Sequence, residues 1–510
     1  MDYHAIAIDF GTSNTVVCRW DPVTHEAITW TLGSLSRAYG AAHVVPSLLF
    51  VEHPHQVVVG DRVRSQRLAQ RDPVRFFQGF KRDLLTPYAP PARQIDGESF
   101  PLADIATRFL AAVLDQIRQS GIPLSQVILT LPVGAPESYQ RWLTDTAQHL
   151  QLAGVQWIDE ATAAALSYAL AQPGSLILVL DFGGGTLDVS LVRLPETGQA
   201  VQVIAQSDAY VGGMDVDVWI VEAHLARWQM PRAQVSALAW SVLVERAEYL
   251  KIQLTDQTEI SDTWFDDQAF MAYELHLTQA ELRQILEEHG FLDQVRQCLD
   301  DVIQTASYQG IRRAQIDQVI LVGGTSYLAA VREVVMNQFG AAKVKADQPL
   351  TAVASGALLL SRQVSVQKTL RSSYALRLWD PYQQSPLYVP LFSQGTPYPS
   401  QLDPVIVQVA HPGQREIRLD VGTVASSSQA ELVYDEQGRM SSRQRIQPQD
   451  YRSLTEGRDP VLYLDPAGDP GVDRLALHFA VDAQRTLRVT IRDLLSQQDL
   501  LQDAVLAYLT

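Results

Sequence analysis

The chain has 510 residues, of which 57 are Asp or Glu and 40 are Lys or Arg, so its formal net charge is -17 at pH 7. This acidic balance disfavours a broad nucleic-acid-binding surface, which needs clustered positive charge. Hydrophobic residues make up 46% and charged residues 19%, which is typical of globular proteins with large cores, and the length suggests two to four domains.

The cysteines and the first residues bear on the cellular compartment. Cys18 and Cys298 are too few for a disulfide framework or a cysteine-based zinc site, so a reducing compartment is expected. The opening MDYHAIAIDFG lacks the basic region and the long apolar stretch of a secretory signal. No run of 18 apolar residues occurs, which predicts that no helix spans a membrane. We therefore expect a cytoplasmic protein.

Apolar runs and helical periodicity alternate over roughly the first 360 residues. The apolar runs predict strands at residues 5–8, 126–131, 176–180 and 318–322. Between them, residues 104–121 place Ile105, Phe109 and Val113 on one helical face, and Gly121 supplies a stop. Strands that alternate with helices predict an α/β fold.

The pattern changes after the segment SRQVSVQKTLRSS at residues 361–373. Apolar residues then recur with a period of two, as one-sided burial of antiparallel strands requires. These residues are Ile417, Leu419 and Val421, then Leu475, Leu477, Phe479 and Val481, then Leu487, Val489 and Ile491. Residues 482–485 predict a hairpin turn, whereas residues 435–472, rich in Asp, Gln, Gly, Arg and Pro, are expected to be irregular. We place a domain boundary at 363–373.

The most informative feature is an internal repeat. IDFGTSNT at residues 8–15 returns as LDFGGGTLD at residues 180–188, each time after an apolar strand, and VGGTS at 322–326 forms a third loop. Glycines let backbone N–H groups approach phosphate oxygens, and hydroxyl residues add donors. Asp9 and Asp181 would face a shared magnesium ion, with Asp188 in the same shell. Because magnesium keeps several waters, these carboxylates need not bind it directly.

A single loop of this kind is more often an ordinary turn, but three loops after three strands make coincidence a poor explanation. None of them fits the Walker pattern GxxxxGK[ST] or the pattern GxGxxG. A different phosphate-binding architecture is therefore required.

The three loops, in this order and spacing, resemble those of the actin-like ATPase superfamily, in which two ribonuclease-H-like lobes close over a nucleotide. Within it the chain is most similar to the DnaK-type, seventy-kilodalton heat-shock chaperone family. Further similar segments are VILTLPVGAPESYQR (127–141), WIDEATAAALSYAL (157–170), YVGGMDVD (210–217), ERAEYLKIQL (245–254) and VASGALLL (353–360). PLFSQGTPYPSQ (390–401) and FAVDAQRTLRVTIRD (479–493) resemble that family's peptide-binding domain.

The resemblance implies an α/β, two-lobed actin-like ATPase domain over residues 1–362, a linker at 363–373 and an antiparallel β-sandwich substrate-binding-like domain over 374–510. The family carries a helical lid after the sandwich, for which no residues are left before Thr510, so a lidless member is expected.

The resemblance assigns catalytic roles to four residues. Lys81 corresponds to a lysine beside the γ-phosphate and the attacking water, and Glu160 to a carboxylate that orients the water or the magnesium shell. Without the resemblance, Lys81 would be taken for a surface lysine and Glu160 for a first-turn acid that the helix dipole favours. Asp181 and Thr186 complete the catalytic set, and Asp9, Asp181 and Asp188 form the metal environment. Ala161 stands where the family usually has proline.

The resemblance also implies a binding site for ATP or ADP with Mg2+ and K+. Its phosphate contacts are Gly11, Thr12, Ser13, Asn14, Gly183, Gly184, Gly185 and Thr186. Its adenosine pocket comprises Gly212, Gly213, Glu248, Lys251, Thr255, Gly323, Gly324, Thr325 and Tyr327. Tyr327 stands where the family commonly has an arginine, and an aromatic ring can stack on a base as well. Glu248 and Lys251, three residues apart on a helix, could equally be an ordinary surface ion pair.

Pro132 and Arg141 resemble the family's interdomain proline switch and arginine relay, with one extra residue between them. The segment at 361–373 lacks the family's run of leucines, which puts coupling between the domains in question. Gln156 replaces an arginine that docks J-domain co-chaperones, which puts that partner in question. A nucleotide-exchange factor is a further implied partner.

Two functions from different classes follow. The first is an ATP-hydrolysing chaperone that binds extended apolar segments of unfolded polypeptide, with Ile417 and Leu419 as candidates for the peptide groove or, alternatively, as plain sandwich core. The second is a non-enzymatic scaffold that holds ATP as a structural ligand and binds one dedicated partner. A sugar kinase or a filament-forming actin relative would share the nucleotide core, but the β domain fits neither.

Overall fold

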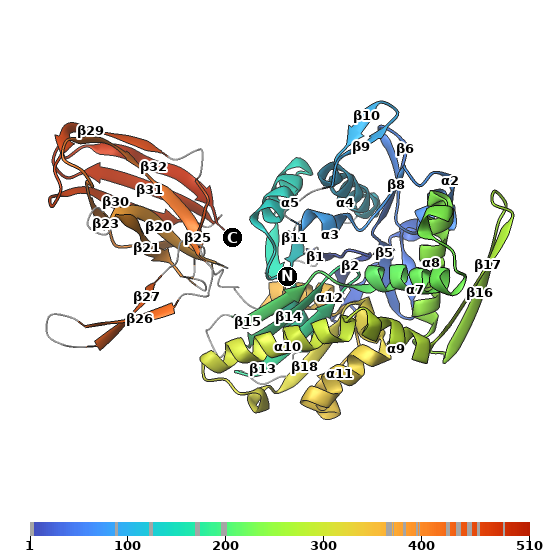
Figure 1. The fold of residues 1–510 in the computed structure, drawn as a ribbon. Coiled ribbons are helices and arrows are strands. Elements are labelled where there is room, and N and C mark those ends of the chain that lie inside the picture. Colours follow the sequence, from blue (N-terminus) through green and yellow to red (C-terminus); the bar gives the residue numbers. More distant parts are fainter. Residues whose placement is uncertain are drawn as a thin grey trace. The chain divides into compact units, whose positions relative to one another are not determined.

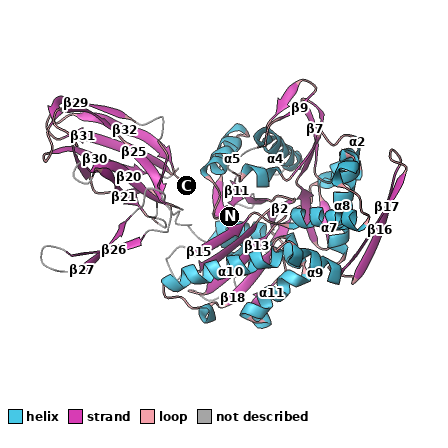
Figure 2. Ribbon diagram, viewed as in Figure 1, coloured by secondary structure: helices cyan, strands magenta, loops and turns pink. Residues whose placement is uncertain are grey.

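A computed structural model describes residues 5–86, 90–121, 126–152, 154–168, 174–194, 201–363, 370, 372–380, 384–393, 396, 398–424, 429–434, 440–445, 451–455, 460–482 and 485–509. The chain divides into two compact units, residues 1–366 and 367–510 (Figure 1). The first contains helices and strands, and the described elements of the second are strands, as Figure 2 shows.

The first unit contains a sheet in the order β12-β11-β1-β2-β5-β4, with β3 also on β2. Its strands are β1 (Ala5–Phe10), β2 (Asn14–Asp21), β3 (Glu26–Thr29), β4 (Arg37–Tyr39), β5 (Ala42–Pro46), β11 (Gln126–Leu131) and β12 (Gln156–Asp159). β1 is parallel to β11 and antiparallel to β2. Ile6 and Ile8 face a core shared with α4 (Leu102–Gln119), whereas Ala5 and Ala7 face one shared with α6 (Glu160–Ser167) and α12 (Ala352–Gln363).

A second sheet of this unit repeats the same arrangement in the order β15-β14-β13-β18-β19. Its strands are β13 (Leu176–Phe182), β14 (Leu187–Arg193), β15 (Gln202–Ala209), β18 (Gln318–Val322) and β19 (Val344–Lys345). β13 is antiparallel to β14 and parallel to β18, as β1 is to β2 and β11. The repeated glycine motifs therefore occupy equivalent turns, between β1 and β2 and between β13 and β14. The four predicted strands and the predicted helix at 104–121 are all present.

Helices and smaller sheets surround these two sheets (Figures 1 and 2). The helices are α1 (Asp61–Ser65), α2 (Leu68–Arg71), α3 (Phe80–Leu84), α5 (Glu137–His149), α7 (Gly213–Arg227), α8 (Ala237–Gln253), α9 (Gln279–Glu288), α10 (Phe291–Tyr308) and α11 (Ala329–Phe339). The strands are β6 (Leu48–His53), β7 (Gln56–Val59), β8 (Phe76–Gln78), β9 (Arg93–Ile95), β10 (Glu98–Phe100), β16 (Glu259–Asp266) and β17 (Met271–Thr278). None of the helices in the described part of the chain combines the length and the apolarity that crossing a bilayer needs.

The second unit consists of antiparallel strand pairs. One sheet has the order β21-β20-β25-β28, and another the order β22-β30-β31-β32, with β23 also on β30. The strands are β20 (Ser373–Asp380), β21 (Ser385–Phe392), β22 (Ser400–Gln401), β23 (Val405–Gln408), β24 (Gln414–Arg418), β25 (Asp420–Val424), β26 (Gln429–Tyr434), β27 (Met440–Arg445), β28 (Tyr451–Ser453), β29 (Val461–Gly468), β30 (Asp473–Val481), β31 (Thr486–Asp493) and β32 (Asp499–Tyr508). Leu376 of one sheet and Leu477 of the other share one hydrophobic core. The predicted hairpin joins β30 to β31.

One prediction for this unit is wrong. Residues 435–472 were expected to be irregular, but the segment contains β27, β28 and β29. β29 pairs with β24, and it alternates buried Leu462 and Leu464 with exposed Tyr463, a pattern too short to stand out among its polar neighbours. Residues 435–439, 446–450 and 456–459 lie outside the described residues, as do residues 364–369 and 371 of the expected linker.

Candidate functional site

The first unit contains a cavity of about 560 Å³ to which all three glycine loops contribute. Most of the residues expected from the sequence line it. They are Asp9, Gly11, Thr12, Ser13, Asn14, Lys81, Glu160, Asp181, Gly183, Gly184, Thr186, Asp188, Gly213, Glu248, Lys251, Thr255, Gly323, Gly324, Thr325 and Tyr327. The structure therefore brings together residues that are up to 318 positions apart.

Two expected residues, Gly185 and Gly212, are not among the lining residues but pack directly behind them. A Cβ atom on Gly212 would lie 2.5 Å from the carbonyl carbon of Gly184. A Cβ atom on Gly184 would lie 1.9 Å from Oγ of Ser13, on the other glycine loop. These close approaches require glycine, because a side chain would force the loops apart.

The first glycine loop is held by Ser47, a residue that the sequence did not single out. Ser47 donates a hydrogen bond from Oγ to the carbonyl oxygen of Gly11 at 2.7 Å, and its backbone N–H donates to the carbonyl oxygen of Ser13 at 2.8 Å. Its Oγ also lies 3.0 Å from Oγ1 of Thr15. Ser47 is fully buried, so these bonds fix the loop without competition from solvent.

At one end of the cavity lies a buried ion pair between Lys81 and Glu160. Lys81 belongs to α3 and Glu160 is the first residue of α6, and their Nζ and Oε1 atoms are 2.9 Å apart. Both residues are at least 94% buried. Burial alone lowers the pKa of Lys81, but Glu160 and other neighbours outweigh it and hold this pKa above its ordinary value. Lys81 is thus a fixed positive charge at the wall of the cavity.

Three further carboxylates share this end of the cavity, and their charges are poorly compensated. Burial and the charge of Glu160 raise the pKa of Asp9 to about 7, although Lys81 and a 3.0 Å hydrogen bond from Oγ1 of Thr130 oppose the shift. Burial and Glu160 likewise raise the pKa of Asp188 to about 7 and that of Asp181 well above its ordinary value. A cation in the cavity would relieve this repulsion.

Direct coordination of such a cation is not prearranged. In the described part of the chain, no three His, Cys, Asp or Glu side chains are close enough together to form a metal-binding group. The carboxylates of Asp9, Asp181 and Asp188 nevertheless line one cavity. A divalent ion that keeps its own waters fits such an arrangement better than one that needs several direct protein ligands.

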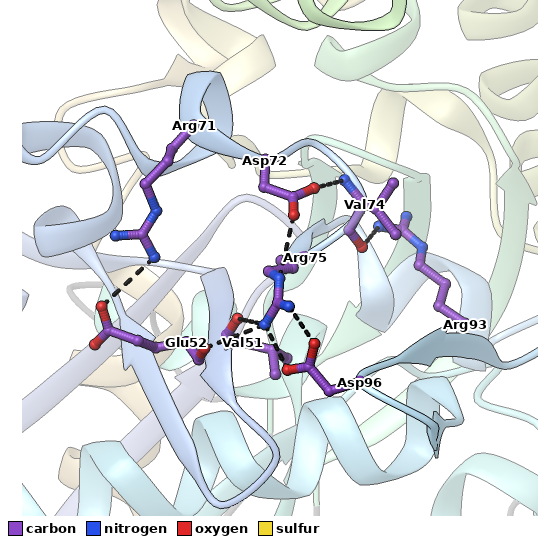
Figure 3. A network of polar contacts seen from close by, with 8 residues as sticks. All are labelled: Val51, Glu52, Arg71, Asp72, Val74, Arg75, Arg93 and Asp96. Atoms are coloured by element: carbon purple, nitrogen blue, oxygen red, sulfur yellow. Dashed lines mark hydrogen bonds and ion pairs between the residues drawn. The ribbon is translucent and has the colours of Figure 1, made fainter.

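The segment that leads to Lys81 is anchored by a polar network around Arg75 (Figure 3). The Arg75 guanidinium binds Asp96 through two nitrogens, Asp72 at 3.1 Å and the carbonyl oxygen of Glu52 at 3.1 Å. Arg93 donates to the carbonyl oxygen of Phe76 at 2.6 Å, at the start of β8. The network ties residues 72–76 to β6 and to the β9–β10 turn, and so fixes the path of the backbone into α3.

A second charged group of lining residues is Lys251 and Glu248 of α8, and each pairs with a residue from a different element. Nζ of Lys251 lies 2.6 Å from Oδ1 of Asp217 and donates to the carbonyl oxygen of Gly213, also at 2.6 Å. Glu248 instead binds Nη2 of Arg64 at 2.5 Å. The surface ion pair between Glu248 and Lys251, considered as an alternative from the sequence, is therefore not formed. No local sequence pattern indicates a role for Asp217 or Arg64, because their partners are distant in the chain.

Tyr327 is 37% exposed and lines the cavity beside Gly324 and Thr325. The guanidinium of Arg332 lies 5.2 Å from the centre of the Tyr327 ring, and Nε of Arg332 is held by the carbonyl oxygen of Ser326 at 2.9 Å. The ring is supported by Arg332 while part of it stays accessible, an arrangement suited to stacking on a planar ligand.

Three further hydrogen bonds connect residues 82–85 to residues 210–215, which lead into and begin α7. Arg82 donates from Nη1 to Oδ1 of Asp215 at 2.9 Å and from Nη2 to the carbonyl oxygen of Tyr210 at 3.0 Å. The Tyr210 hydroxyl donates to the carbonyl oxygen of Leu85 at 2.9 Å. Together with Arg64 and Glu248, these contacts join the elements that carry Lys81 to those that carry Lys251.

The remaining expected residues do not line this cavity. Pro132 is buried after β11, and Arg141 is exposed on α5. Ile417 is 7% exposed and Leu419 is 0% exposed, and both belong to the hydrophobic core of the second unit. As the structure stands, neither side chain is accessible to a peptide, and their burial agrees with the alternative that they are plain core residues.

Comparison with known proteins gives consistent results. A family model described as "Hsp70 protein" matches residues 91–372. The chain is 26% identical over 366 residues to "Chaperone protein DnaK" of Elusimicrobium minutum (strain Pei191), which covers 69% of this chain and 56% of that protein. It is 26% identical over 381 residues to "Heat shock 70 kDa protein, mitochondrial" of Solanum tuberosum, which covers 69% of this chain and 54% of that protein. The chain thus matches a little over half the length of these relatives.

Proposed function

Because the chain belongs to the Hsp70 protein family, we propose that it binds ATP, hydrolyses it to ADP and phosphate, and uses the nucleotide state to control the binding of unfolded polypeptide. The single observation that carries the proposal is the cavity itself. Three glycine loops, the Lys81–Glu160 pair and the carboxylates of Asp9, Asp181 and Asp188 all line it.

These residues suit transfer of a phosphoryl group to water, which needs positioning and charge neutralisation more than covalent help. Backbone N–H groups of the loops, with the hydroxyls of Thr12, Ser13 and Thr186, would hold the phosphates. The Lys81 ammonium would stabilise the negative charge that develops on the transferred group, and Glu160 would keep that ammonium in place. The reaction forms a bond between the water oxygen and the γ-phosphorus. It breaks the bond between the γ-phosphorus and the oxygen that bridges it to the β-phosphate, which leaves with ADP.

Magnesium fits the acidic end of the cavity. Asp9, Asp181 and Asp188 would hold it, largely through water, since they form no compact set of direct ligands. When bound, the ion would neutralise phosphate charge.

The adenosine would lie at the opposite end of the cavity. Tyr327 would stack on the base, and Glu248, Lys251 and Thr255 of the α8 region would contact the ribose. The ion pairs of Glu248 with Arg64 and of Lys251 with Asp217 keep the two polar side chains in defined positions.

We extend the proposal to the domain organisation. Residues 1–362 would form the two-lobed ATPase domain, a reading that the repeated sheet topology supports. Residues 363–373 would be the linker, and residues 374–510 a β-sandwich that binds polypeptide, supported by antiparallel sheets that share one core. Pro132 and Arg141, both outside the cavity, would carry the nucleotide signal.

A single-turnover ATPase assay with magnesium and potassium tests the catalytic part. Lys81→Ala should reduce the rate by at least about a hundredfold while nucleotide still binds. Lys345→Ala is the matched control, because Lys345 is exposed on β19 and outside the cavity. Hydrolysis by Lys81→Ala at the wild-type rate would refute the assignment. Stimulation of turnover by an unfolded apolar peptide separates the chaperone from the non-enzymatic scaffold, which requires none.

A further inference from the structure

Tyr139 of α5 is 1% exposed, and in the described part of the chain its hydroxyl has no hydrogen-bond partner. Buried hydroxyl groups are normally paired, because an unpaired polar group away from water destabilises the fold. The neighbouring Gln140, which is also buried, follows this rule, since its Nε2 donates to the carbonyl oxygen of Ala135 at 2.8 Å. The unpaired group is therefore specific to Tyr139 and not a general property of this part of α5.

The Tyr139 ring belongs to an aromatic cluster that reaches the catalytic end of the cavity. Its centre lies 5.4 Å from that of Trp142, which lies 5.9 Å from that of Phe10, which in turn stacks on Phe80 at 6.0 Å. Phe10 directly follows Asp9, and Phe80 directly precedes Lys81. Trp142 is itself locked by a 3.1 Å hydrogen bond from Nε1 to the carbonyl oxygen of Ala103. The cluster holds the phenol rigidly against the same backbone that positions the cavity residues.

The charges of Lys81, Glu160 and Asp9 all act on the ionisation of the Tyr139 hydroxyl. Burial raises the pKa of Tyr139 above its ordinary value, the carboxylates of Glu160 and Asp9 add to the shift, and Lys81 opposes it. The phenol is therefore neutral at neutral pH and offers one donor and free acceptor capacity.

A water molecule would satisfy this hydroxyl. A buried water needs a polar site with two to four hydrogen-bonding partners. The Tyr139 hydroxyl, the Lys81 ammonium and the Glu160 carboxylate, which belong to three different helices, are the groups that would supply them. An apolar core position would offer no such partners. The buried hydroxyl without a partner among the described residues, on a ring that is connected to the residues next to Asp9 and Lys81, thus distinguishes Tyr139 from an ordinary core tyrosine.

We propose that Tyr139 is a positioning residue for ATP hydrolysis, whose hydroxyl orders a buried water against the Lys81–Glu160 pair when nucleotide occupies the cavity. The inference rests on the proposed ATPase function and adds a residue to it. Through this water, the phenol limits the movement of the Lys81 ammonium and the Glu160 carboxylate relative to the transferred phosphate. Tyr139 itself does not touch the reacting atoms.

Tyr139→Phe tests the role, because it removes only the hydroxyl and keeps the ring in the aromatic cluster. We expect a single-turnover hydrolysis rate about tenfold lower than that of the wild type, a typical effect of losing an outer positioning group. The dissociation constant for ATP should be unchanged. Tyr273→Phe is the matched control, since Tyr273 is a buried tyrosine of the same unit that packs on Trp228 and Trp264 and does not line the cavity. It should change neither quantity.

The melting temperature of the nucleotide-free protein completes the test. Tyr139→Phe keeps the ring and its contacts with Trp142, so it should melt within a few degrees of the wild type, and a lower hydrolysis rate then reports positioning and not unfolding. A large decrease in melting temperature would assign the hydroxyl a structural role and would overturn the proposal. Normal hydrolysis by Tyr139→Phe beside an active wild type would overturn the role of Tyr139 alone. A wild-type protein that binds ATP without hydrolysing it would overturn the ATPase function and this role with it.

Discussion

Nζ of Lys81 lies 2.9 Å from Oε1 of Glu160, and the two residues, 79 positions apart in the chain, are both buried at one end of the cavity. Removing one partner of a buried pair is costly because the other charge stays buried without compensation. The pair therefore links the stability of the fold to its chemistry, and either residue can be tested on both counts.

Glu160→Gln should slow single-turnover hydrolysis by at least about tenfold, because Lys81 loses the carboxylate that holds it. It should also lower the free energy of unfolding by about 3 kcal/mol. Glu333→Gln serves as the control. Glu333 is exposed on α11 and paired with Arg283, so its loss should change stability by less than about 0.5 kcal/mol. Equal effects of the two substitutions on stability would contradict the importance of the buried pair.

Arg64→Ala should accelerate nucleotide dissociation severalfold. The Arg64–Glu248 ion pair joins residues 184 positions apart, and both side chains are mostly buried, so its loss removes a connection between the two sides of the cavity. Dissociation of a fluorescent ATP analogue, followed by stopped flow, measures the effect. Arg62→Ala, an exposed change on the same short helix, should leave the rate as it is. An unchanged rate in Arg64→Ala would show that the ion pair does not restrain the nucleotide.

Asp188→Asn should stabilise the protein in the absence of nucleotide and magnesium, and more so at pH 8 than at pH 5. The folded-state pKa of Asp188 is about 7 against an ordinary value of 3.8. Between these values the folded chain holds a proton that the unfolded chain has released, so the Asp188 contribution to stability falls as the pH rises. Asparagine cannot ionise, so the variant does not lose this stability as the pH rises.

Melting temperatures of the two proteins across the pH range give the measurement. We expect a gain of about 2 kcal/mol at pH 8, less than the full shift would give, and little gain near pH 4. Asp267→Asn, at an exposed residue in the β16–β17 turn, is the control and should show no such trend. A gain that is the same at every pH would exclude ionisation of Asp188 as its cause.

Tyr327→Ala should weaken ATP binding by about tenfold, since stacking of an aromatic ring on a base contributes about 1 to 3 kcal/mol. Tyr327→Phe should bind nearly as well as the wild type, because the ring remains over the Arg332 guanidinium. Calorimetric titration with ATP separates the variants. Tyr308→Ala, at the exposed end of α10, controls for the loss of a surface tyrosine. If Tyr327→Phe loses as much affinity as Tyr327→Ala, the hydroxyl and not the ring is responsible.

Several features of the site could be predicted from the sequence because they involve residues that are close together in the chain. The motif IDFGTSNT and its repeat LDFGGGTLD each combine an apolar strand with a glycine turn, so a strand pattern and a turn pattern sufficed to predict them. β27, β28 and β29 were missed for the opposite reason. β27 and β28 are largely polar, and the apolar alternation of β29 is short. Strand formation there depends on pairing with partners such as β24 and β25, which a local pattern does not reveal.

By itself, the sequence determined the repeated strand-loop-strand units, the acids at their ends and the change from helix periodicity to strand alternation near residue 363. These features depend on residues only a few positions apart in the chain. The spacing of their apolar side chains and the turn preference of their glycines are therefore visible in the sequence. Only the tertiary structure decided that Glu248 pairs with Arg64 and not with Lys251, and that Ser47 fixes the first loop. The same holds for the Tyr139 hydroxyl, which has no hydrogen-bond partner among the described residues. Burial and pairing are settled when distant segments pack together, because only then does each polar group lose water and gain, or fail to gain, a partner.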